Sequence, residues 1–405
     1  MQLSHWKRIA GPGLIFASTA IGVSHLVQST RAGADYGFAL IGVVILANVF
    51  KYPSFEYGVR YAVATGQSLV HGYKQLGRWA IVLLTISTLG SMFAVTAAVS
   101  FVCAGIMSPV FGDSISHAII ILLLFVTVGV LLWVGKFPWL DRIVKLIATL
   151  ILISTFVAFF IALWNFDFSS YQALPSGEVY SLSSLAFLVA LVGWMPSAID
   201  ISVMSSIWTI EKAKSEHYRP TLKEALLEFR LGYLITAVTA ILFLGLGAML
   251  MFGAGEHFSD NATVFAQQFF ALFTTSLGAW SYPIILVSAI SVMFSTVLAV
   301  FDGYSRVMSR LVFAKMEGNK SQLIWIIILG LGSYLLATAF AGSLKGLVDF
   351  ATTVSFVIGP IFAAMNMLVI SKFLHEFQKP GRWLWRLSWL GLIFLTAFAA
   401  FYLLY

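Results

Sequence analysis

Residues 11–37 read GPGLIFASTAIGVSHLVQSTRAGADYG, an apolar stretch that is interrupted near its middle by GVSH at residues 22–25. Burying polar groups at the centre of a membrane helix costs several kcal/mol unless they are hydrogen-bonded, so this interruption indicates a functional role. A second interruption, GWMPS at residues 193–197, lies inside the apolar run that begins near Leu182. Two broken helices at corresponding places in two halves of a membrane protein indicate the substrate site of an inverted-repeat fold.

The composition places the chain in the membrane class. Of its 405 residues, 60% are hydrophobic and 10% are charged, and a soluble protein of this length could not cover so much apolar surface. The single cysteine, Cys103, lies in an apolar run, which excludes a disulfide framework and a thiolate cluster. No cleavable signal peptide is evident after Lys7 and Arg8, so the first helix also serves as the targeting signal.

Apolar runs that are long enough to cross about 30 Å of hydrocarbon predict eleven membrane spans. They cover residues 12–32, 37–57, 80–106, 115–135, 142–164, 182–208, 230–252, 281–303, 323–341, 346–370 and 384–404. Residues 262–279 are shorter and follow a polar stretch, and we expect an amphipathic helix on the outer surface there.

The basic residues predict the orientation. With a cytoplasmic N-terminus, all of the 24 lysines and arginines except Arg31 and Lys345 fall on the cytoplasmic side of the membrane. The net charge of +7 then follows from topology, and no nucleic-acid partner is expected. We expect one domain, residues 1–405, in the lipid bilayer of the cell (inner) membrane. Its two five-span repeats of opposite orientation cover residues 12–164 and 182–370, and residues 384–404 add an extra helix.

An unwound helix exposes the NH groups of one half-helix, which favour anions, and the carbonyls of the other, which favour cations. Around the first break the local polar groups are Ser18, Thr19, Ser24 and His25, with no carboxylate among them. Around the second break, Asp200 is the only acid, beside Met195, Ser197 and Ser202. Of the acids near membrane depth, Asp200, Asp302 and Asp349 are functional candidates by default.

Five short motifs share their order and spacing with one family. They are GPG at 11–13, RAGADYG at 31–37, ATGQSL at 64–69, FPWLDRIVKLIA at 137–148 and Met195-Pro196. On these motifs the chain resembles the Nramp metal transporters over nearly its whole length. The resemblance implies an all-α, LeuT-like five-plus-five fold and the proton-coupled import of divalent transition metals.

The residues of the family's metal site differ here. The family's Asp-Pro-Gly-Asn in the first broken helix reads Gly22, Val23, Ser24 and His25, and the last residue of its Met-Pro-His reads Ser197. A divalent cation needs a hard anionic ligand to offset its dehydration, so no metal site is expected. Residues 81–105 and 323–340 contain no Asp, Glu, Lys or Arg, which removes the family's proton route as well.

We therefore expect a secondary transporter of a small anion, with bicarbonate as the leading candidate and sodium or proton coupling as the options. Amide and hydroxyl donors at two helix N-termini suit a compact oxyanion. The expected substrate residues are Gly22, Ser24, His25, Gly193, Trp194, Met195, Ser197, Thr352 and Thr353, the two threonines through the resemblance. The expected coupling-ion residues are Ser295, Thr296 and Asp200.

Other interpretations stay open. A divalent cation, manganese or magnesium, would use Asp200, Met195 and backbone carbonyls. His25 could instead bond a neighbouring span. Lys51, with Glu56 and Arg60, is expected to form an ion network or to snorkel at the cytoplasmic end of its span. A sensor or scaffold is disfavoured because no soluble domain is visible, and neither an enzyme nor a cofactor is expected because no catalytic constellation appears.

Overall fold

The computed structural model describes residues 16–404, apart from residues 18, 113–114, 135–137, 216 and 313–319. The GPG motif at 11–13 and Phe137 lie outside the described residues. Every regular element in the described part is a helix, as the composition predicts. The longer elements are η1 (Ser24–Ser29), α3 (Thr30–Tyr36), α4 (Ile41–Thr65), α5 (Leu69–Leu76), α6 (Arg78–Phe111), α7 (His117–Val134), α8 (Pro138–Asn165), α10 (Leu182–Trp194), α11 (Ile201–Ser215), α12 (Leu222–Leu250), α13 (Ala262–Leu277), α14 (Tyr282–Val312), α15 (Lys320–Ala339), α16 (Leu344–Phe373) and α17 (Arg382–Leu404). Short turns of helix are η2 (Gly37–Leu40), α9 (Ser176–Val179), η3 (Phe252–Ala254), η4 (Ala279–Ser281) and η5 (Glu376–Gln378).

The expected spans can be followed in these helices. Among the described residues, 8 helical stretches are long and apolar enough to cross a membrane, and one of them, Ser24–Thr65, contains the second part of the first expected span and all of the second span. The described apolar part of α8 and the pair α10 and α11, which is interrupted at residues 195–200, supply the fifth and sixth spans. The segment at 262–279 forms α13, a helix of 16 residues, as its shorter apolar run predicts.

Local sequence explains where several helices begin and end. Thr221 and Glu224 form a capping box at the start of α12, in which the Glu224 amide donates to Thr221 Oγ1 at 3.3 Å. Asn261 Oδ1 accepts from the first amides of α13 at 3.0 and 3.1 Å. Helix α4 ends at Thr65, and the following residue, Gly66, has a φ of 69°, which lies in the left-handed region that favours glycine.

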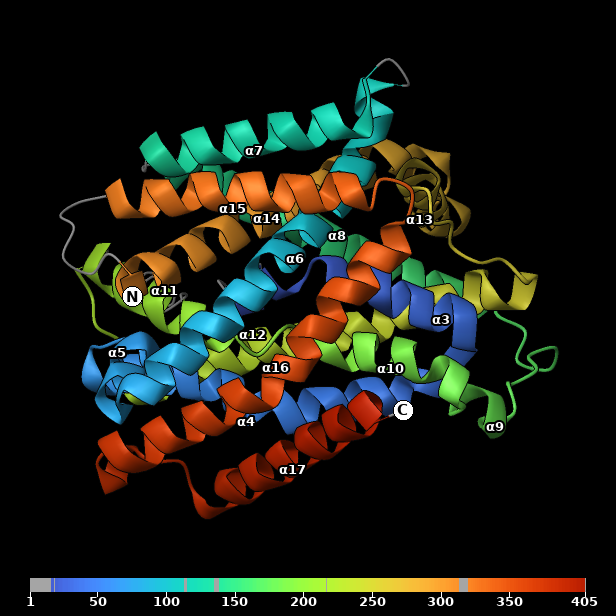
Figure 1. Cartoon of the computed structure of the whole chain (residues 1–405). Helices are drawn as coiled ribbons and strands as arrows, with labels where there is room; N and C mark the ends of the chain where they lie inside the picture. Colours follow the sequence, from blue (N-terminus) through green and yellow to red (C-terminus); the bar gives the residue numbers. More distant parts are fainter. Residues whose placement is uncertain are drawn as a thin grey trace, which may run out of the picture.

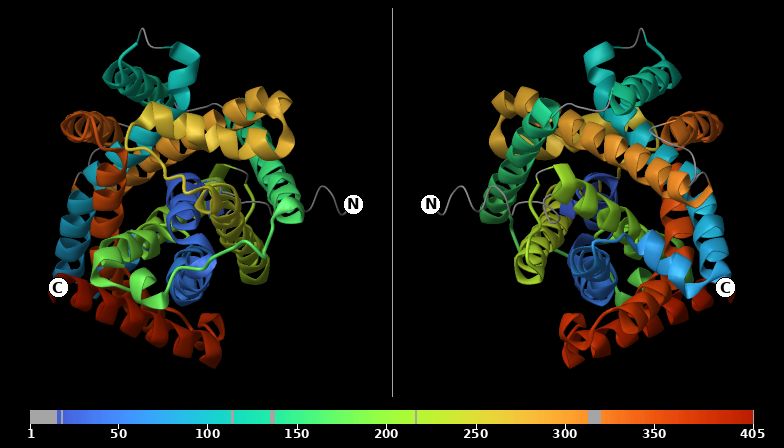
Figure 2. Two further views of the ribbon diagram at one scale, coloured as in Figure 1. Left: turned by 90° about the vertical axis from the view of Figure 1, so that its right-hand side faces the viewer. Right: turned by 90° about the vertical axis from the view of Figure 1, so that its left-hand side faces the viewer.

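The helices form one bundle around the two interrupted segments (Figure 1). Helix α6 packs against α14, α15, α16 and α7, and most of its apolar stretch is buried. Helices α7 and α17 lie at opposite edges of the bundle, as the end-on views of Figure 2 show, while α3 and α10 lie nearer its centre. The interior position of the interrupted segments means that polar groups there must be satisfied by other helices rather than by solvent.

Helices α3 and α12 approach each other with their backbones in contact. A Cβ atom added to Gly33 would lie 1.9 Å from the carbonyl oxygen of Leu244, and one added to Gly247 would lie 2.2 Å from that of Thr30. Small residues at a membrane-helix interface allow such close approach, where packing takes the place of the hydrophobic effect. This contact holds the second half of span one against α12.

Because of this contact, we expect Gly33→Ala to lower the midpoint of thermal unfolding of the purified protein in detergent. The added methyl group must push the helices apart, and overpacking of this kind typically costs about 1–3 kcal/mol. Gly90→Ala in α6 is the matched control, since a Cβ atom there meets nothing within 4 Å. An equal shift in both variants would show that α3 and α12 are not packed through Gly33.

Candidate functional site

The first interruption is a bend followed by a wide helical turn. Ile21 and Gly22 lie in the bend, and η1, a π-helix, begins at Ser24. The Gly22 carbonyl accepts from the amides of His25 and Leu26 at 3.0 and 2.9 Å. A Cβ atom on Gly22 would lie 2.8 Å from Thr296 Oγ1 of α14, so glycine is the residue that fits this approach without displacement. Such π-type turns inside helices often occur at functional sites.

The second interruption separates α10 from α11. Helix α10 ends at Trp194, residues 195–200 are not helical, and α11 begins at Ile201. The predicted break in span six is therefore present in the structure. Because helix α10 stops inside the bundle, the carbonyls of its last turn lack the i+4 amide partners of a continuing helix, although the Met195 amide donates to the Val192 carbonyl at 3.4 Å.

Lys51 binds these carbonyls. Its side chain reaches from the middle of α4, and its Nζ donates to the carbonyls of Val192 and Gly193 at 2.9 Å each and of Ser197 at 2.6 Å. The residue is 1% exposed. The ammonium therefore uses all three of its donors and lies where the dipole of α10 is negative.

This position corrects the prediction that Lys51 snorkels or joins an ion network at the cytoplasmic end of its span. The network contains Glu56, Arg60 and Arg230 instead, with Arg60 Nη2 at 2.5 Å and Arg230 Nη2 at 3.2 Å from the Glu56 carboxylate. Lys51 falls in the middle of a long apolar helix, and that depth is the signal that could have identified it from sequence.

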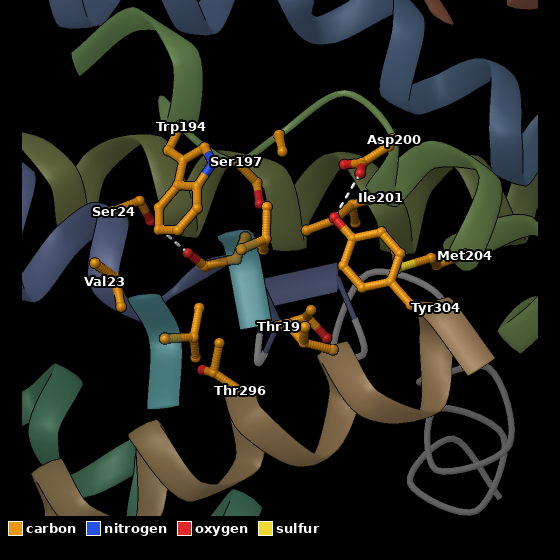
Figure 3. A pocket seen from close by; sticks show the side chains of 15 residues that line it. Thr19, Val23, Ser24, Trp194, Ser197, Asp200, Ile201, Met204, Thr296 and Tyr304 are labelled. Atoms are coloured by element: carbon orange, nitrogen blue, oxygen red, sulfur yellow. Dashed lines mark hydrogen bonds between the residues drawn. The ribbon is translucent and has the colours of Figure 1, made fainter. Parts of the chain in front are cut away.

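A small cavity lies between the two interruptions (Figure 3). Its volume is about 30 Å³, and its polar lining residues are Thr19, Ser24, Ser197, Asp200, Thr296 and Tyr304. Trp194 forms part of the wall, and its indole Nε1 donates to Ser355 Oγ at 2.9 Å, which ties α10 to α16. Five of the predicted site residues thus meet here, from three separate segments. Tyr304, from α14, was not predicted, because only the tertiary packing brings it to the cavity.

Asp200 is buried in this cavity and is only partly hydrogen-bonded. Tyr304 donates its hydroxyl to Asp200 Oδ2 at 2.7 Å, and Ser91 Oγ lies 3.4 Å from the same oxygen. Asp200 Oδ1 has no hydrogen-bond partner among the described residues. The residue is 5% exposed, so one oxygen of a carboxylate is neither solvated nor paired.

The side chain of His25 points away from the cavity. Its Nε2 donates to the Thr236 carbonyl of α12 at 2.9 Å, and its Nδ1 lies 2.7 Å from Ser24 Oγ. In this structure His25 therefore does not face the substrate cavity. Its hydrogen bond to α12 agrees with the alternative prediction, in which His25 bonds a neighbouring span. The reason is helical geometry, since Ser24 and His25 are consecutive and face different sides of η1.

The other predicted substrate residues surround the cavity without lining it. A Cβ atom on Gly193 would lie 2.3 Å from the Thr352 carbonyl, so this glycine serves the close packing of α10 on α16. Ser29 Oγ lies 3.7 Å from Met195 Sδ, and Met195 is fully buried. Thr353 and the predicted coupling residue Ser295 are half-buried and lie off the cavity.

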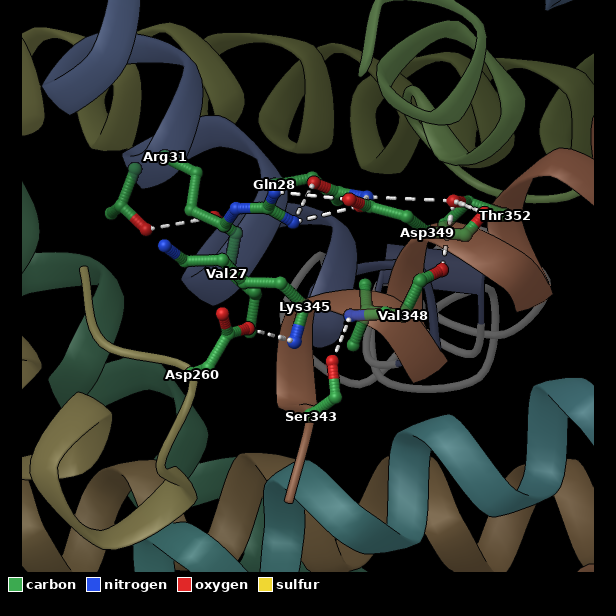
Figure 4. Close-up of polar contacts among 11 residues, drawn as sticks. Val27, Gln28, Arg31, Asp260, Ser343, Lys345, Val348, Asp349 and Thr352 are labelled. Atoms are coloured by element: carbon green, nitrogen blue, oxygen red, sulfur yellow. Dashed lines mark hydrogen bonds and ion pairs between the residues drawn. The ribbon is translucent and has the colours of Figure 1, made fainter. Parts of the chain in front are cut away.

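A second polar cluster joins span one to α16 (Figure 4). Arg31 Nη1 and Nη2 donate to the two carboxylate oxygens of Asp349 at 2.7 and 3.1 Å. Gln28 Nε2 lies 3.1 Å from Asp349 Oδ1 and 3.4 Å from Thr352 Oγ1. Thr352 therefore belongs to this cluster rather than to the cavity, and Asp349 has a fixed cationic partner.

Asp302 is also paired. Its carboxylate accepts from Arg306 Nε at 2.7 Å and from the Trp208 indole at 2.8 Å. No group of three or more His, Cys, Asp or Glu side chains in the described part of the chain is arranged to hold a metal ion. The cavity offers a divalent cation one buried carboxylate, that of Asp200, and no cluster of three such ligands is found in the described part of the chain.

Solved structures share the arrangement of helices. A mutant of the manganese transporter of Eremococcus coleocola superposes with a TM-score of 0.66 at 14% identity, covering 97% of this chain and 86% of that chain. A Na⁺-coupled sialic acid symporter in a substrate-bound outward-open state gives 0.59 at 13% identity, covering 97% and 89%. A transporter of the nucleobase-cation-symport-1 family in a closed conformation gives 0.62 at 15%, covering 91% and 80%. The predicted LeuT-like fold is confirmed.

Sequence comparison gives a nearer relative. An uncharacterised protein of Pasteurella multocida (strain Pm70) is 34% identical over 402 residues, which is 97% of this chain and 91% of that protein. The family model described as natural resistance-associated macrophage protein-like matches residues 13–405. The match spans both interruptions and all of the described helices. The chain belongs to the Nramp family.

Proposed function

We propose that this protein is a secondary transporter that moves a small anion, with bicarbonate as the leading candidate, by alternating access around the two interrupted helices. Family membership and the transporter folds that it resembles support a secondary transporter with a small-ion substrate in a multi-pass membrane protein, rather than an enzyme. The contacts of the site support a substrate with a negative charge.

The hydrogen bonds of Lys51 are the main observation that favours an anion over a cation. An unwound helix offers a cation the carbonyls at the end of its first half. Here the carbonyls of Val192, Gly193 and Ser197 already accept hydrogen bonds from an ammonium of the protein itself. A cationic substrate would have to compete with this tethered charge, whereas an anion is attracted to it.

The rest of the cavity is consistent with an anion. Gly22 replaces the aspartate that the family motif carries, and Ser197 supplies a hydroxyl group to the space. The hydroxyls of Ser24 and Thr296 also line it, and they would have to turn from the carbonyls of Ala20 and Val292, to which they donate at 2.7 and 2.9 Å, in order to bind an anion. Hydroxyl and amide donors are the groups that recognise oxyanions. The cavity of about 30 Å³ holds one or two water-sized bodies. Bicarbonate binding therefore requires a wider state of the same site, as alternating access implies.

A divalent cation, manganese or magnesium, is the second candidate. One observation favours it: Asp200 presents an unpaired carboxylate oxygen to the cavity. The manganese transporter of Eremococcus coleocola, which shares the fold, also acts on such an ion according to its name. Met195 gives little support, because its sulfur does not line the cavity and instead lies near Ser29 Oγ.

Uptake of labelled bicarbonate into proteoliposomes, beside uptake of manganese and magnesium, tests the two candidates. We expect bicarbonate flux without metal flux, since the carbonyl end of α10 is occupied by Lys51. Empty liposomes provide the background for each ion. Flux of a divalent metal without bicarbonate would contradict the proposal and support the second candidate.

Gly22→Asp should abolish bicarbonate uptake. A negative charge about 4 Å from the anion costs about 4 kcal/mol at an effective dielectric constant of about 20, which predicts at least a hundredfold loss. Gly22→Asn is the matched control for size, because any side chain here approaches Thr296. We expect the Asn variant to keep clearly more uptake than the Asp variant. Equal losses would mean that crowding, and not charge, governs this position.

Lys51→Met should lower bicarbonate uptake by about tenfold or more, because it removes the positive charge and takes a hydrogen-bond donor away from three buried carbonyls, at about 1–3 kcal/mol for each one left unpaired. The vacated carbonyls should also let manganese raise the thermal stability of the variant. Lys74→Met is the control. Lys74 Nζ also donates to a backbone carbonyl, that of Arg310, at 2.8 Å, but this hydrogen bond is exposed to solvent. Unchanged bicarbonate uptake in Lys51→Met would contradict the role given to Lys51.

A further inference from the structure

We propose that Asp200 is the carboxylate ligand of a sodium-ion site in the cavity between the two interruptions, and that this ion is the coupling ion of transport. The binding of sodium does not depend on which substrate the protein carries. Its role as the coupling ion rests on the proposed function as an anion transporter.

The first observation is the unpaired oxygen. Asp200 is 5% exposed, and its Oδ1 has no hydrogen-bond partner among the described residues, although Oδ2 accepts from Tyr304 at 2.7 Å. Buried carboxylate oxygens are almost always bonded, because desolvation without a partner costs free energy. This oxygen is therefore available to a ligand that the protein binds from outside.

The second observation is the cavity that Asp200 lines. Its volume of about 30 Å³ admits a water-sized body, for which about 10–15 Å³ suffices. Ser197 of the second interruption and Thr296 and Tyr304 of α14 contribute hydroxyl oxygens to the same lining (Figure 3). A carboxylate with several neutral oxygens is the ligand set that hard cations prefer.

The charge of the site favours a monovalent ion. The other acids discussed above are paired with arginines, Asp302 with Arg306 and Asp349 with Arg31. Asp200 forms no ion pair within 4.0 Å in the described part of the chain, and Lys51 directs its donors to carbonyls instead. One carboxylate offsets one positive charge, and no second acid stands beside it to offset a divalent ion.

A proton fits these observations less well. Protonation of Asp200 Oδ1 would replace an unpaired acceptor by an unpaired donor, since this oxygen has neither a donor nor an acceptor in reach among the described residues. A sodium ion would both bind the oxygen and fill the space.

The same charges explain how sodium would favour an anion. Without sodium, Lys51 and Asp200 offset each other in charge within one buried region. A bound sodium ion adds one positive charge and so raises the affinity for an anion near Ser24 and Ser197. By thermodynamic linkage the anion then raises the affinity for sodium by the same factor.

The test is the binding of radiolabelled sodium to the purified full chain, with no bicarbonate present and with choline as the replacing cation. We expect saturable binding by the unmodified protein and its loss in Asp200→Asn, which keeps the size of the side chain. Asp302→Asn is the matched control, and we expect it to bind as the unmodified protein does. Size-exclusion profiles and the thermal midpoint in choline show that each variant is folded.

Two neighbouring residues of α14 provide a test that does not depend on the folding of Asp200→Asn. Thr296 lines the cavity and Ser295 does not. Thr296→Val should raise the half-saturating sodium concentration by about 5-fold to 10-fold, as expected for one lost polar contact, and Ser295→Ala should leave it unchanged. Equal effects in the two variants, or binding that survives in Asp200→Asn, would overturn the proposed site.

The outcomes separate this inference from the proposed function. Sodium binding that requires Asp200, without bicarbonate flux, would support the ion site and contradict the anion substrate. Bicarbonate flux that a pH gradient drives and a sodium gradient does not would overturn the sodium assignment and leave the anion substrate in place. A sodium gradient that drives bicarbonate uptake, with loss of that drive in Thr296→Val, would support both.

Discussion

The structure depends on the three hydrogen bonds of one lysine. Helix α10 stops inside the bundle, and bare carbonyls at that depth would cost several kcal/mol in a membrane. Lys51 satisfies carbonyls on both sides of the break, at Val192 and Gly193 before it and at Ser197 after it. It therefore fixes the path of the unwound segment and places Trp194 and Ser197 against the cavity. The positive charge of Lys51, which stabilises this unwound segment, also lies near the proposed substrate site.

The sequence was sufficient to predict the helical membrane fold, the two interruptions and most of the cavity's polar residues. Glycine, proline and polar residues at the centre of apolar runs locate a break because continuous helices disfavour them there. Sequence could not predict which way neighbouring side chains face within a break. Ser24 lines the cavity while His25 turns to Thr236, and this difference depends on the π-helical turn of η1. Tyr304 was missed because its distance from Asp200 follows from the packing of α14 alone.

The distribution of charge separates structural acids from the one at the site. Asp302, Asp349 and Glu56 each have an arginine partner, and these pairs connect neighbouring turns or neighbouring helices. Charges that are paired in this way neutralise each other and leave little field at the cavity. Asp200 and Lys51 differ, because each is held by neutral groups. The two charges offset each other only at a distance, without a direct ion pair, so each can still attract an ion of opposite sign that enters between the interruptions.

The backbone contact between α3 and α12 also bears on motion. Side chains at a helix interface can change rotamer and let two helices tilt apart while they stay packed. At Gly33 and Gly247 there is no side chain that could adjust, because backbone meets backbone. We therefore expect α3 and α12 to move as one rigid body. A change between outward and inward access then has to be absorbed where span one is already unwound, at Ile21 and Gly22, which makes this bend the hinge of the molecule.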